Sequence, residues 1–209
     1  MAAVKLTKNE QKKQKDQLKQ FLRYLPTLQL KKQQLQMVIR QIEQEVVILQ
    51  QKQKTLVDAL QSWVAVFHEN SRFAEHQQLD SIVVVDKVIK EKGNIAGVKI
   101  PVFKELTFQH IIYDLDQYPL WVDSGVRSLK EIARYDAMIA TLEKQIELLG
   151  RELRVTSQRV NLFEKVKIPE TRENIRKIGI YLGDQQTAAV VRGKIAKKKL
   201  VKQSQEGVA

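Results

Sequence analysis

The chain has 209 residues, of which 43% are hydrophobic and 29% are charged, and its formal net charge is +12. It contains no cysteine, which excludes disulfides and thiolate metal sites and fits a reducing compartment. The longest unbroken apolar run, Trp63–Phe67, is far shorter than the roughly 20 residues that a membrane span needs. We therefore expect no membrane insertion, and the lysine-rich beginning of the chain lacks the apolar core of a signal peptide.

The positive charge is concentrated at the two ends of the chain. Residues 1–32 contain nine Lys or Arg and two acids, and residues 150–209 contain fourteen and six, whereas residues 33–149 are slightly acidic. If both ends lie together, one tip of the molecule is strongly positive. Such a tip would bind nucleic acid phosphates, occupy an acidic or carbonyl-lined cavity of a partner, or simply be a solvated surface.

The sequence predicts one long helix over residues 9–69, with Thr7 or Asn9 as its N-cap. From Leu18 to Phe67 the positions spaced alternately by three and four are apolar in thirteen of fifteen cases, which is typical of a coiled coil. Pro26 inside the helix predicts a kink. Lys32 and Gln53 are the two polar interruptions of this spacing, which ends at Phe67. The residues of the predicted seam before Phe67 are Leu18, Phe21, Leu25, Leu28, Leu35, Ile39, Ile42, Val46, Leu49, Leu56, Leu60 and Trp63.

Residues 70–126 predict a small insert that contains a β-hairpin. Two β-branched runs, Ile82–Val85 with the apolar residues just after it and Val98–Phe103, flank a glycine-containing loop at 93–97. Pro101 would then lie on a sheet edge. A further strand is expected between Phe108 and Tyr113.

Residues 127–196 predict a second long helix, followed by a flexible basic tail at 197–209. After Pro169 the apolar spacing resumes one residue out of phase, which predicts a kink and a change of supercoil. The second predicted seam consists of Ile132, Tyr135, Ile139, Leu142, Ile146, Leu149, Leu153, Thr156, Val160 and Phe163.

The simplest arrangement pairs the two long helices with each other. The predicted fold is therefore mainly α: a long antiparallel two-helix coiled coil with a small central insert containing a β-hairpin. If the turn lies near the insert, facing residues have numbers that sum to 195–200. This register places Pro26 near Pro169 and Lys32 near Lys167.

No motif for catalysis or for a bound cofactor emerges from the sequence. The segment Gly93–Lys99 lacks the spacing of a phosphate-binding loop. His68, His76 and His110 match no metal-ligand spacing, and a turn before Tyr118 explains the Asp114 and Asp116 pair as well as a cation site does. We expect no catalytic residue, no metal and no cofactor.

Three segments resemble the D subunit of V-type (archaeal or vacuolar-type) rotary ATPases. The run Arg159-Val160-Asn161 with Glu164 and Ile168-Pro169 matches the family pattern T-x-x-R-V-N-x-L-E-x-x-x-I-P, except that Phe163 replaces the usual Leu. The basic start of the chain resembles the N-terminal helix of the family, and Gly97–Pro101 resembles its G-x-K-[VI]-P segment. The end of the chain departs from the family, because Gly183–Ala188 replaces a charged stretch.

The resemblance implies the non-catalytic central rotor shaft of such an ATPase. The shaft would couple ATP hydrolysis or synthesis in a ring of catalytic and regulatory nucleotide-binding subunits to proton or sodium transport. Its other expected partners are the small F subunit and a funnel-shaped subunit that joins the shaft to the membrane rotor ring, with a cytoplasmic location peripheral to the membrane and no nucleic acid bound. The residues expected to contact the bore of the ring, here called the basic set, are Lys8, Lys12, Lys13, Arg176, Arg192 and Lys194.

Two alternatives fit the sequence less completely. A standalone coiled-coil module would bind nucleic acid through its basic termini, although no aromatic residues stand among the terminal lysines to stack on bases. A coupling stalk of an export ATPase would share the shaft mechanism but would not need the hairpin.

Overall fold

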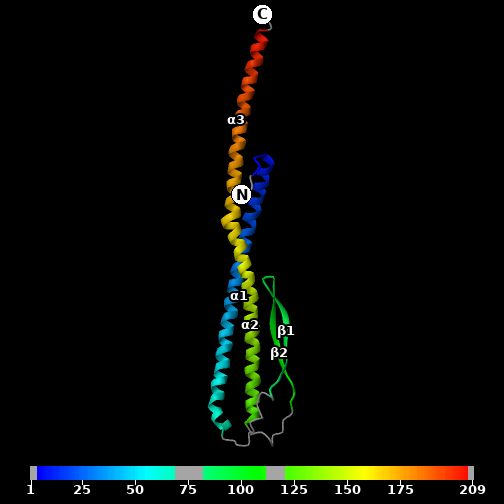
Figure 1. Cartoon of the computed structure of the whole chain (residues 1–209), viewed down its shortest axis with the longest axis vertical. Helices are drawn as coiled ribbons and strands as arrows, with labels where there is room; N and C mark the ends of the chain where they lie inside the picture. The colour runs from blue at the N-terminus through cyan, green and yellow to red at the C-terminus, as the bar shows by residue number, and fades with distance from the viewer. Residues whose placement is uncertain (1–3, 69–81, 112–120, 207–209) are drawn as a thin grey trace. The chain divides into compact units, whose positions relative to one another are not determined.

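A computed structural model of the chain describes residues 4–68, 82–111 and 121–206, with side chains described at 4–61, 82–111 and 121–201. The elements are α1 (Lys8–His68), β1 (Val85–Ile95), β2 (Val98–Phe108), α2 (Val122–Leu162), the π-helical segment η2 (Phe163–Lys167) and α3 (Ile168–Glu206) (Figure 1). The contacts divide the chain into two units. Unit 1 is Met1–Leu30 with Thr156–Ala209, and unit 2 is Lys31–Val155.

Unit 2 is an antiparallel pair of helices with the hairpin packed against it. Leu35 and Ile42 of α1 form a buried cluster with Leu149 of α2, and Val46 and Leu49 form a second one with Ile139. These residues come from the predicted heptads, and burying them removes aliphatic surface from water along the contact between the helices. The expected fold class, a mainly helical antiparallel coiled coil with a central hairpin, is confirmed.

Polar side chains also connect the two helices of unit 2. Lys31 Nζ lies 2.7 Å from Glu152 Oε1. Gln53, one of the two polar interruptions of the first predicted seam, donates from Nε2 to Asp136 Oδ1 at 2.6 Å. The interruption at Gln53 therefore places a polar cross-helix contact where the apolar repeat fails.

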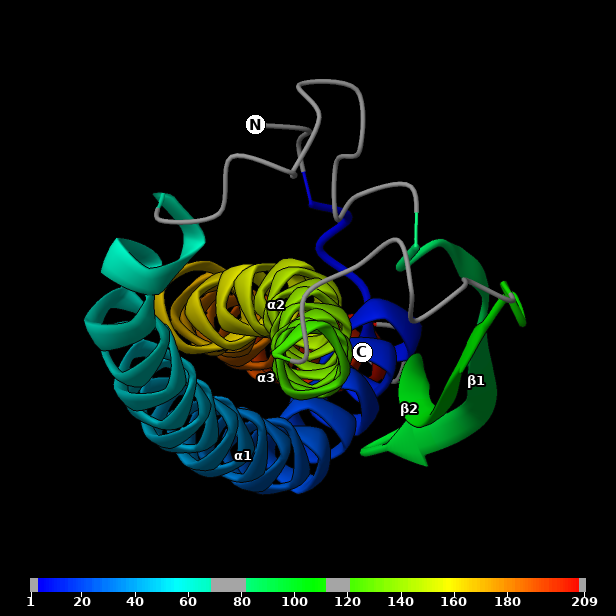
Figure 2. The same cartoon turned by 90° about the horizontal axis from the view of Figure 1, so that it is seen from below.

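The hairpin lies beside α2, with β2 nearer to the helices (Figures 1 and 2). Ile100 of β2 is 4% exposed and joins the cluster of Leu35 and Leu149. Gln145 of α2 donates from Nε2 to the carbonyl oxygen of Pro101 at 2.6 Å. One apolar contact and one hydrogen bond from a buried side chain thus fix the hairpin on the coiled coil.

The hairpin strands are longer and their loop is shorter than expected. The loop is only Ala96 and Gly97, at φ +51° and +83°, between the paired residues Ile95 and Val98. Two left-handed residues are the geometry of a type I′ turn, which matches the twist of the flanking strands. Gly93, expected in the loop, is a strand residue instead, and a β-carbon there would lie 2.8 Å from Val102 Cγ2.

The expected further strand from Phe108 to Tyr113 is not formed as such. Phe108 is the last residue of β2, and Ile111 is in no strand. The described sheet has two strands, β1 and β2. Both are edge strands, which accommodates Pro101 as predicted. Ile112 and Tyr113 lie outside the described residues, as do His76, Asp114 and Asp116.

Two glycines of unit 2 should respond in opposite directions to alanine. Neither Gly97 nor Gly150 has an atom within 4 Å of an added β-carbon, so backbone conformation alone decides the effect. Gly97→Ala places alanine at φ +83° and should destabilise the hairpin by about 1–2 kcal/mol. Gly150→Ala, inside α2, should stabilise by about 1 kcal/mol. Urea unfolding followed by circular dichroism measures both; shifts of equal sign would contradict the assigned backbone geometry.

Unit 1 pairs the first part of α1 with the end of α2, η2 and the first part of α3. The α1 helix begins with a cap in which Glu10 N donates to Thr7 Oγ1 at 3.2 Å. Across the pair, the rings of Phe21 and Phe163 have centroids 5.3 Å apart. No α1 side chain from Lys8 to Leu30 is buried, whereas Leu35–Leu49 contribute four that are. Packing on the α1 side is thus looser in unit 1.

The one-residue phase shift near Pro169 is absorbed by the π-helical segment. The N–H of Ile168 donates to the carbonyl oxygen of Phe163, five residues earlier, so η2 contains one more residue than an α-helical turn. After it, Ile168, Thr171 and Ile178 are buried, all one residue later than the heptads before Phe163 predict. Pro26 lies inside α1, and Pro169 lies in the first turn of α3.

The expected helix register was wrong by about ten residues. Phe21 faces Phe163, and Gln11 Nε2 lies 3.5 Å from where a β-carbon on Gly179 would stand, so facing numbers in unit 1 sum to 184–190. In unit 2 the residue numbers of the Lys31–Glu152 and Gln53–Asp136 contacts sum to 183 and 189. Pro26 is therefore not level with Pro169. Lys32 follows Lys31, which pairs with Glu152, and so it does not face Lys167. One cause is that α2 begins at Val122, five residues before the expected start.

Candidate functional site

Four of the six residues of the basic set come from the paired part of unit 1. Lys8, Lys12 and Lys13 occupy the first two turns of α1, and all three are exposed. By the register of Gln11 with Gly179, Arg176 of α3 is level with Gln14, the residue after Lys13. The start of α1 and the facing part of α3 therefore both carry exposed cations at this level of unit 1.

The other two residues of the basic set, Arg192 and Lys194, lie on a part of α3 without a facing helix among the described residues. The register places Lys8, the first residue of α1, level with Leu182, and α3 continues to Glu206 (Figure 1). We call residues 183–206 the α3 extension. Helix thus reaches well into the segment 197–209 for which a flexible tail was expected.

The α3 extension combines exposure with a high density of positive charge. From residue 183 to 201 every side chain is exposed except the half-buried Ala188. Between Arg192 and Lys202 there are six basic residues and no acid. Aliphatic side chains are also exposed there, with Val190 at 58% and Leu200 at 67%. This surface can make charge-assisted hydrogen bonds to carboxylates or carbonyls and can bury apolar area against a partner.

Arg176 is held by a carboxylate of its own helix. It donates from Nε and Nη2 to Glu173 at 2.8 and 2.7 Å. The hydrogen bonds from Arg176, followed by its charge, lower the pKa of Glu173, and the same pair raises the pKa of Arg176. Arg176 therefore presents a partly neutralised charge, whereas Lys8, Lys12 and Lys13 form no ion pair with any described residue.

The Glu173 pair gives a test by titration. The folded-state pKa of Glu173 is depressed, so the pair stabilises α3 above the unfolded pKa and this contribution is lost as the pH falls through the folded pKa. Arg176→Gln should raise the pKa of Glu173 toward its ordinary value of about 4.3, measured from side-chain carboxyl shifts by NMR. Arg172→Gln, another exposed cation of α3, is the control and should leave the titration in place. Identical titration in Arg176→Gln and wild type would contradict the pairing.

The seam residues are distributed over both units. Buried members are Leu35, Ile42, Val46, Leu49, Ile139, Leu149, Thr156 and Val160. Half-buried members are Leu18, Phe21, Leu25, Leu28, Ile39, Leu56, Leu60, Ile132, Tyr135, Leu142, Ile146, Leu153 and Phe163. The side chain of Trp63 lies outside the described ones. No seam residue with a described side chain is exposed.

Sequence reasoning missed several residues on the inner side of α2 and its continuation. Thr141 and Gln145 are buried although polar, because Thr141 Oγ1 donates to the carbonyl oxygen of Ala137 at 2.7 Å and Gln145 reaches Pro101. Because both residues are polar, the apolar spacing could not identify them as buried. Ile168 and Thr171 are also buried, and the one-residue shift of the apolar spacing would have identified both.

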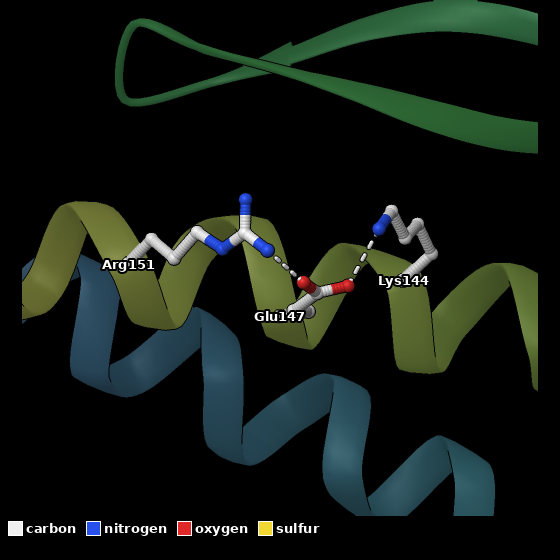
Figure 3. A network of polar contacts seen from close by, with 3 residues as sticks. All are labelled: Lys144, Glu147 and Arg151. Carbon is white, nitrogen blue, oxygen red and sulfur yellow. Dashed lines mark hydrogen bonds and ion pairs between the residues drawn. The ribbon is translucent and has the colours of Figure 1, made fainter.

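The outer surface of α2 carries a small ion-pair network. Glu147 accepts hydrogen bonds from Lys144 at 2.6 Å and from Arg151 (Figure 3). The hydrogen bond from Lys144, together with the charge of Arg151, lowers the pKa of Glu147. All three residues are spaced by three or four along one exposed side of the helix, as in ion pairs that stabilise helices locally. This network stabilises α2 and forms no reactive centre.

Neither a metal cluster nor a membrane span is found within the described parts of the chain. No group of three or more His, Asp or Glu side chains there is placed to hold a metal ion. None of the described helices combines the length and the hydropathy required to cross a bilayer. The functional surface consists of basic and apolar faces of helices, which is suited to binding other proteins.

Comparison with known proteins assigns this architecture to a family. The family model of the ATP synthase D subunit matches residues 10–198. The V-type ATP synthase D subunit of Borreliella burgdorferi is 51% identical over 208 residues, which is 100% of both chains. Proteins of the same name in Chlamydia muridarum and Chlamydia pneumoniae are 34% and 32% identical, over 94% of this chain and 96% and 93% of theirs. The resemblance carried by the Arg159–Pro169 segment is thus confirmed, and the chain belongs to the family of D subunits of V-type ATP synthases, as one component of a rotary ATPase.

Proposed function

We propose that this chain is the central rotor shaft of its ATPase. It couples ATP hydrolysis or synthesis in a hexamer of catalytic and regulatory subunits to proton or sodium transport, and performs no catalysis itself. The observation that carries the proposal is the α3 extension, an exposed basic helix that continues past the start of α1. A helix of this kind can enter a cavity of a surrounding ring.

The physical role of such a shaft is to bias its partners between states. A surface that differs from side to side presents a different face to each catalytic site as it turns. Each site then has a different free-energy balance between its open and closed forms, because only differential contacts shift a conformational equilibrium. In unit 1, the exposed cations and the exposed aliphatic residues of α3 would provide this difference between faces.

The contacts of the basic set fit a part that must turn. Exposed ion pairs contribute only about 0–1 kcal/mol each and weaken with salt. Several such contacts to acidic or carbonyl groups would centre the α3 extension without locking it. Unit 2 would carry the remaining attachments, to the F subunit and to the funnel-shaped component on the membrane rotor ring, which makes the chain a cytoplasmic, peripheral part of the complex.

Rotation can be observed directly because the chain has no native cysteine. Lys92→Cys, at an exposed position of β1, gives one site for attaching a bead. With the hexamer immobilised, ATP should drive unidirectional rotation of the bead, and a bead on the hexamer itself is the control. A bead on the introduced cysteine that stays still while ATP is hydrolysed would refute the shaft proposal.

A further inference from the structure

The β-hairpin is attached to the coiled coil through few buried residues. No residue of β1 is buried, and on β2 only Ile100 and Leu106 are. A hydrogen bond from Gln145 to the carbonyl oxygen of Pro101 joins β2 to α2. A segment with few buried apolar contacts opens at a lower free-energy cost than the core of a protein does. The hairpin is therefore the described part of unit 2 that opens most readily.

The two strands hold each other along their whole length. They pair from Val85 with Phe108 at the base of the hairpin to Ile95 with Val98 at its tip. The two-residue turn closes the tip, and an ion pair between side chains of the two strands adds a further contact. None of these contacts involves a helix, so the strands keep them when the tip moves away from α2.

The base of the hairpin is attached separately, to the first turns of α2. Ile82, just before β1, is 4% exposed and forms a buried cluster with Val122 and Val126. At the end of β2, the ring centroid of Phe108 lies 5.6 Å from Lys130 Nζ, which is a cation–π contact. Different residues thus hold the base and the tip, so the tip can be released while the base stays attached as a hinge.

The side of α2 that contacts the hairpin is partly polar, which lowers the cost of release. Gln145 and Thr141 lie one turn apart on the same side of the helix, and both are buried. Thr141 donates its hydrogen bond to Ala137 of its own helix and keeps it after release. Gln145 loses its bond to Pro101, but water replaces this bond, so the net loss is small. The seam between α1 and α2 consists of apolar clusters, which water does not stabilise in this way.

The tip of the hairpin contacts both helices at once. Ile100 lies in one cluster with Leu35 and Ile42 of α1 and with Leu149 of α2. Leu35 and Leu149 are 0% exposed there, whereas the buried members of the second cluster, which includes no hairpin residue, are 6–8% exposed. The tip thus completes the burial of the helix pair at this level. A contact that needs both helices in place is linked to their pairing, and such a linkage acts in both directions.

We propose that the hairpin is a hinged strap. Its tip lifts from the helices about its base, and in the docked state Ile100 strengthens the pairing of α1 with α2. When one helix slides or twists past the other, the space that receives Ile100 changes, and the strap shifts toward its open state because only the docked state uses that space. The strap thus responds to the state of the coiled coil. This inference goes beyond the proposed function and does not depend on rotation.

Thiol labelling tests the release of the strap, because the chain has no native cysteine. Ile100→Cys places a thiol under the docked strap, and Leu49→Cys places one in the seam, in the cluster without a hairpin residue. Val102→Cys, at a position that is 39% exposed, gives the rate of an exposed thiol. In the full chain under native conditions, a thiol reagent should modify Ile100→Cys at least about tenfold faster than Leu49→Cys, and more slowly than Val102→Cys.

Two results of the labelling would overturn the proposal. Equal rates for Ile100→Cys and Leu49→Cys would show that the tip opens only when the helices separate. Equal rates for Ile100→Cys and Val102→Cys would show that no docked state exists.

Hydrogen exchange tests the link between the strap and the helix pair. Ile100→Ala should lower the protection of the α1 amides from Leu35 to Ile42 at least about tenfold, whereas Val102→Ala, a truncation on the same strand, should leave it unchanged. Circular dichroism shows that each variant has kept its helices. Unchanged protection in Ile100→Ala would overturn the link. Both measurements use the full chain alone, so a failure of the strap is distinguished from a failure of the rotation assay.

Discussion

Replacing both Arg192 and Lys194 with glutamate should lower ATP hydrolysis by the assembled complex about tenfold at low salt. In the proposed shaft, each reversal would remove an attractive contact of the α3 extension and add a repulsive one. Two such changes at about 0.5–1 kcal/mol each correspond to a factor of several to thirty. The steady-state rate of ATP hydrolysis and the torque on an attached bead measure the effect. The difference from wild type should shrink at higher ionic strength, where exposed charges are screened.

The control for this prediction is a reversal of equal size elsewhere. Lys90→Glu with Lys92→Glu changes two exposed lysines of β1 in unit 2 and the net charge by the same amount. It should leave hydrolysis close to wild type. An equal loss in both variants would mean that net charge matters and the position does not, and unchanged hydrolysis in the Arg192 and Lys194 variant would remove the basic set from the coupling surface.

Leu149→Ala should destabilise unit 2 by about 2–5 kcal/mol, the range for truncating a fully buried leucine. Leu149 is 0% exposed and lies in one cluster with Leu35 and Ile42 of α1 and Ile100 of the hairpin. Its truncation leaves a cavity where three elements meet, so both helix pairing and hairpin docking weaken. Urea unfolding of the isolated chain, followed by far-ultraviolet circular dichroism, gives the free energy of unfolding.

Val155→Ala is the matched truncation in the same unit. Val155 is 39% exposed, and surface substitutions usually change stability by no more than about 0.5 kcal/mol. A similar loss for both variants would show that Leu149 is not the centre of the packing. Hydrogen exchange at the β2 amides adds a local readout, since hairpin protection should fall in Leu149→Ala only.

The helices and their buried sides were predictable because one physical rule fixes them. A residue every 3.5 positions along a helix meets the partner helix, so the buried Leu35, Ile42 and Leu149 follow from the spacing alone. The hairpin was predictable from β-branched runs around a glycine, and the family from the Arg159–Pro169 segment. The phase shift after Phe163 was visible as well, although a π-helical segment was not the expected form.

The register and the hairpin contacts could not be predicted in the same way. Sliding one heptad helix along another by seven residues keeps every apolar residue in the seam, so the spacing cannot choose between registers. Specific polar contacts do choose, such as Lys31 with Glu152 and Gln53 with Asp136. The seat of the hairpin depends on Gln145, a polar residue whose burial follows only from the neighbouring carbonyl of Pro101.

The π-helical segment also marks the place where a one-residue deletion would restore a regular α-helix. Val160 and Ile168 are both buried and eight positions apart, so deleting one residue between Phe163 and Lys167 would restore a spacing of seven. An uninterrupted α-helix could then bury both residues in the same stripe. The ring of Pro169 would meet a backbone carbonyl of that regular helix, so relatives without the extra residue should also lack the proline.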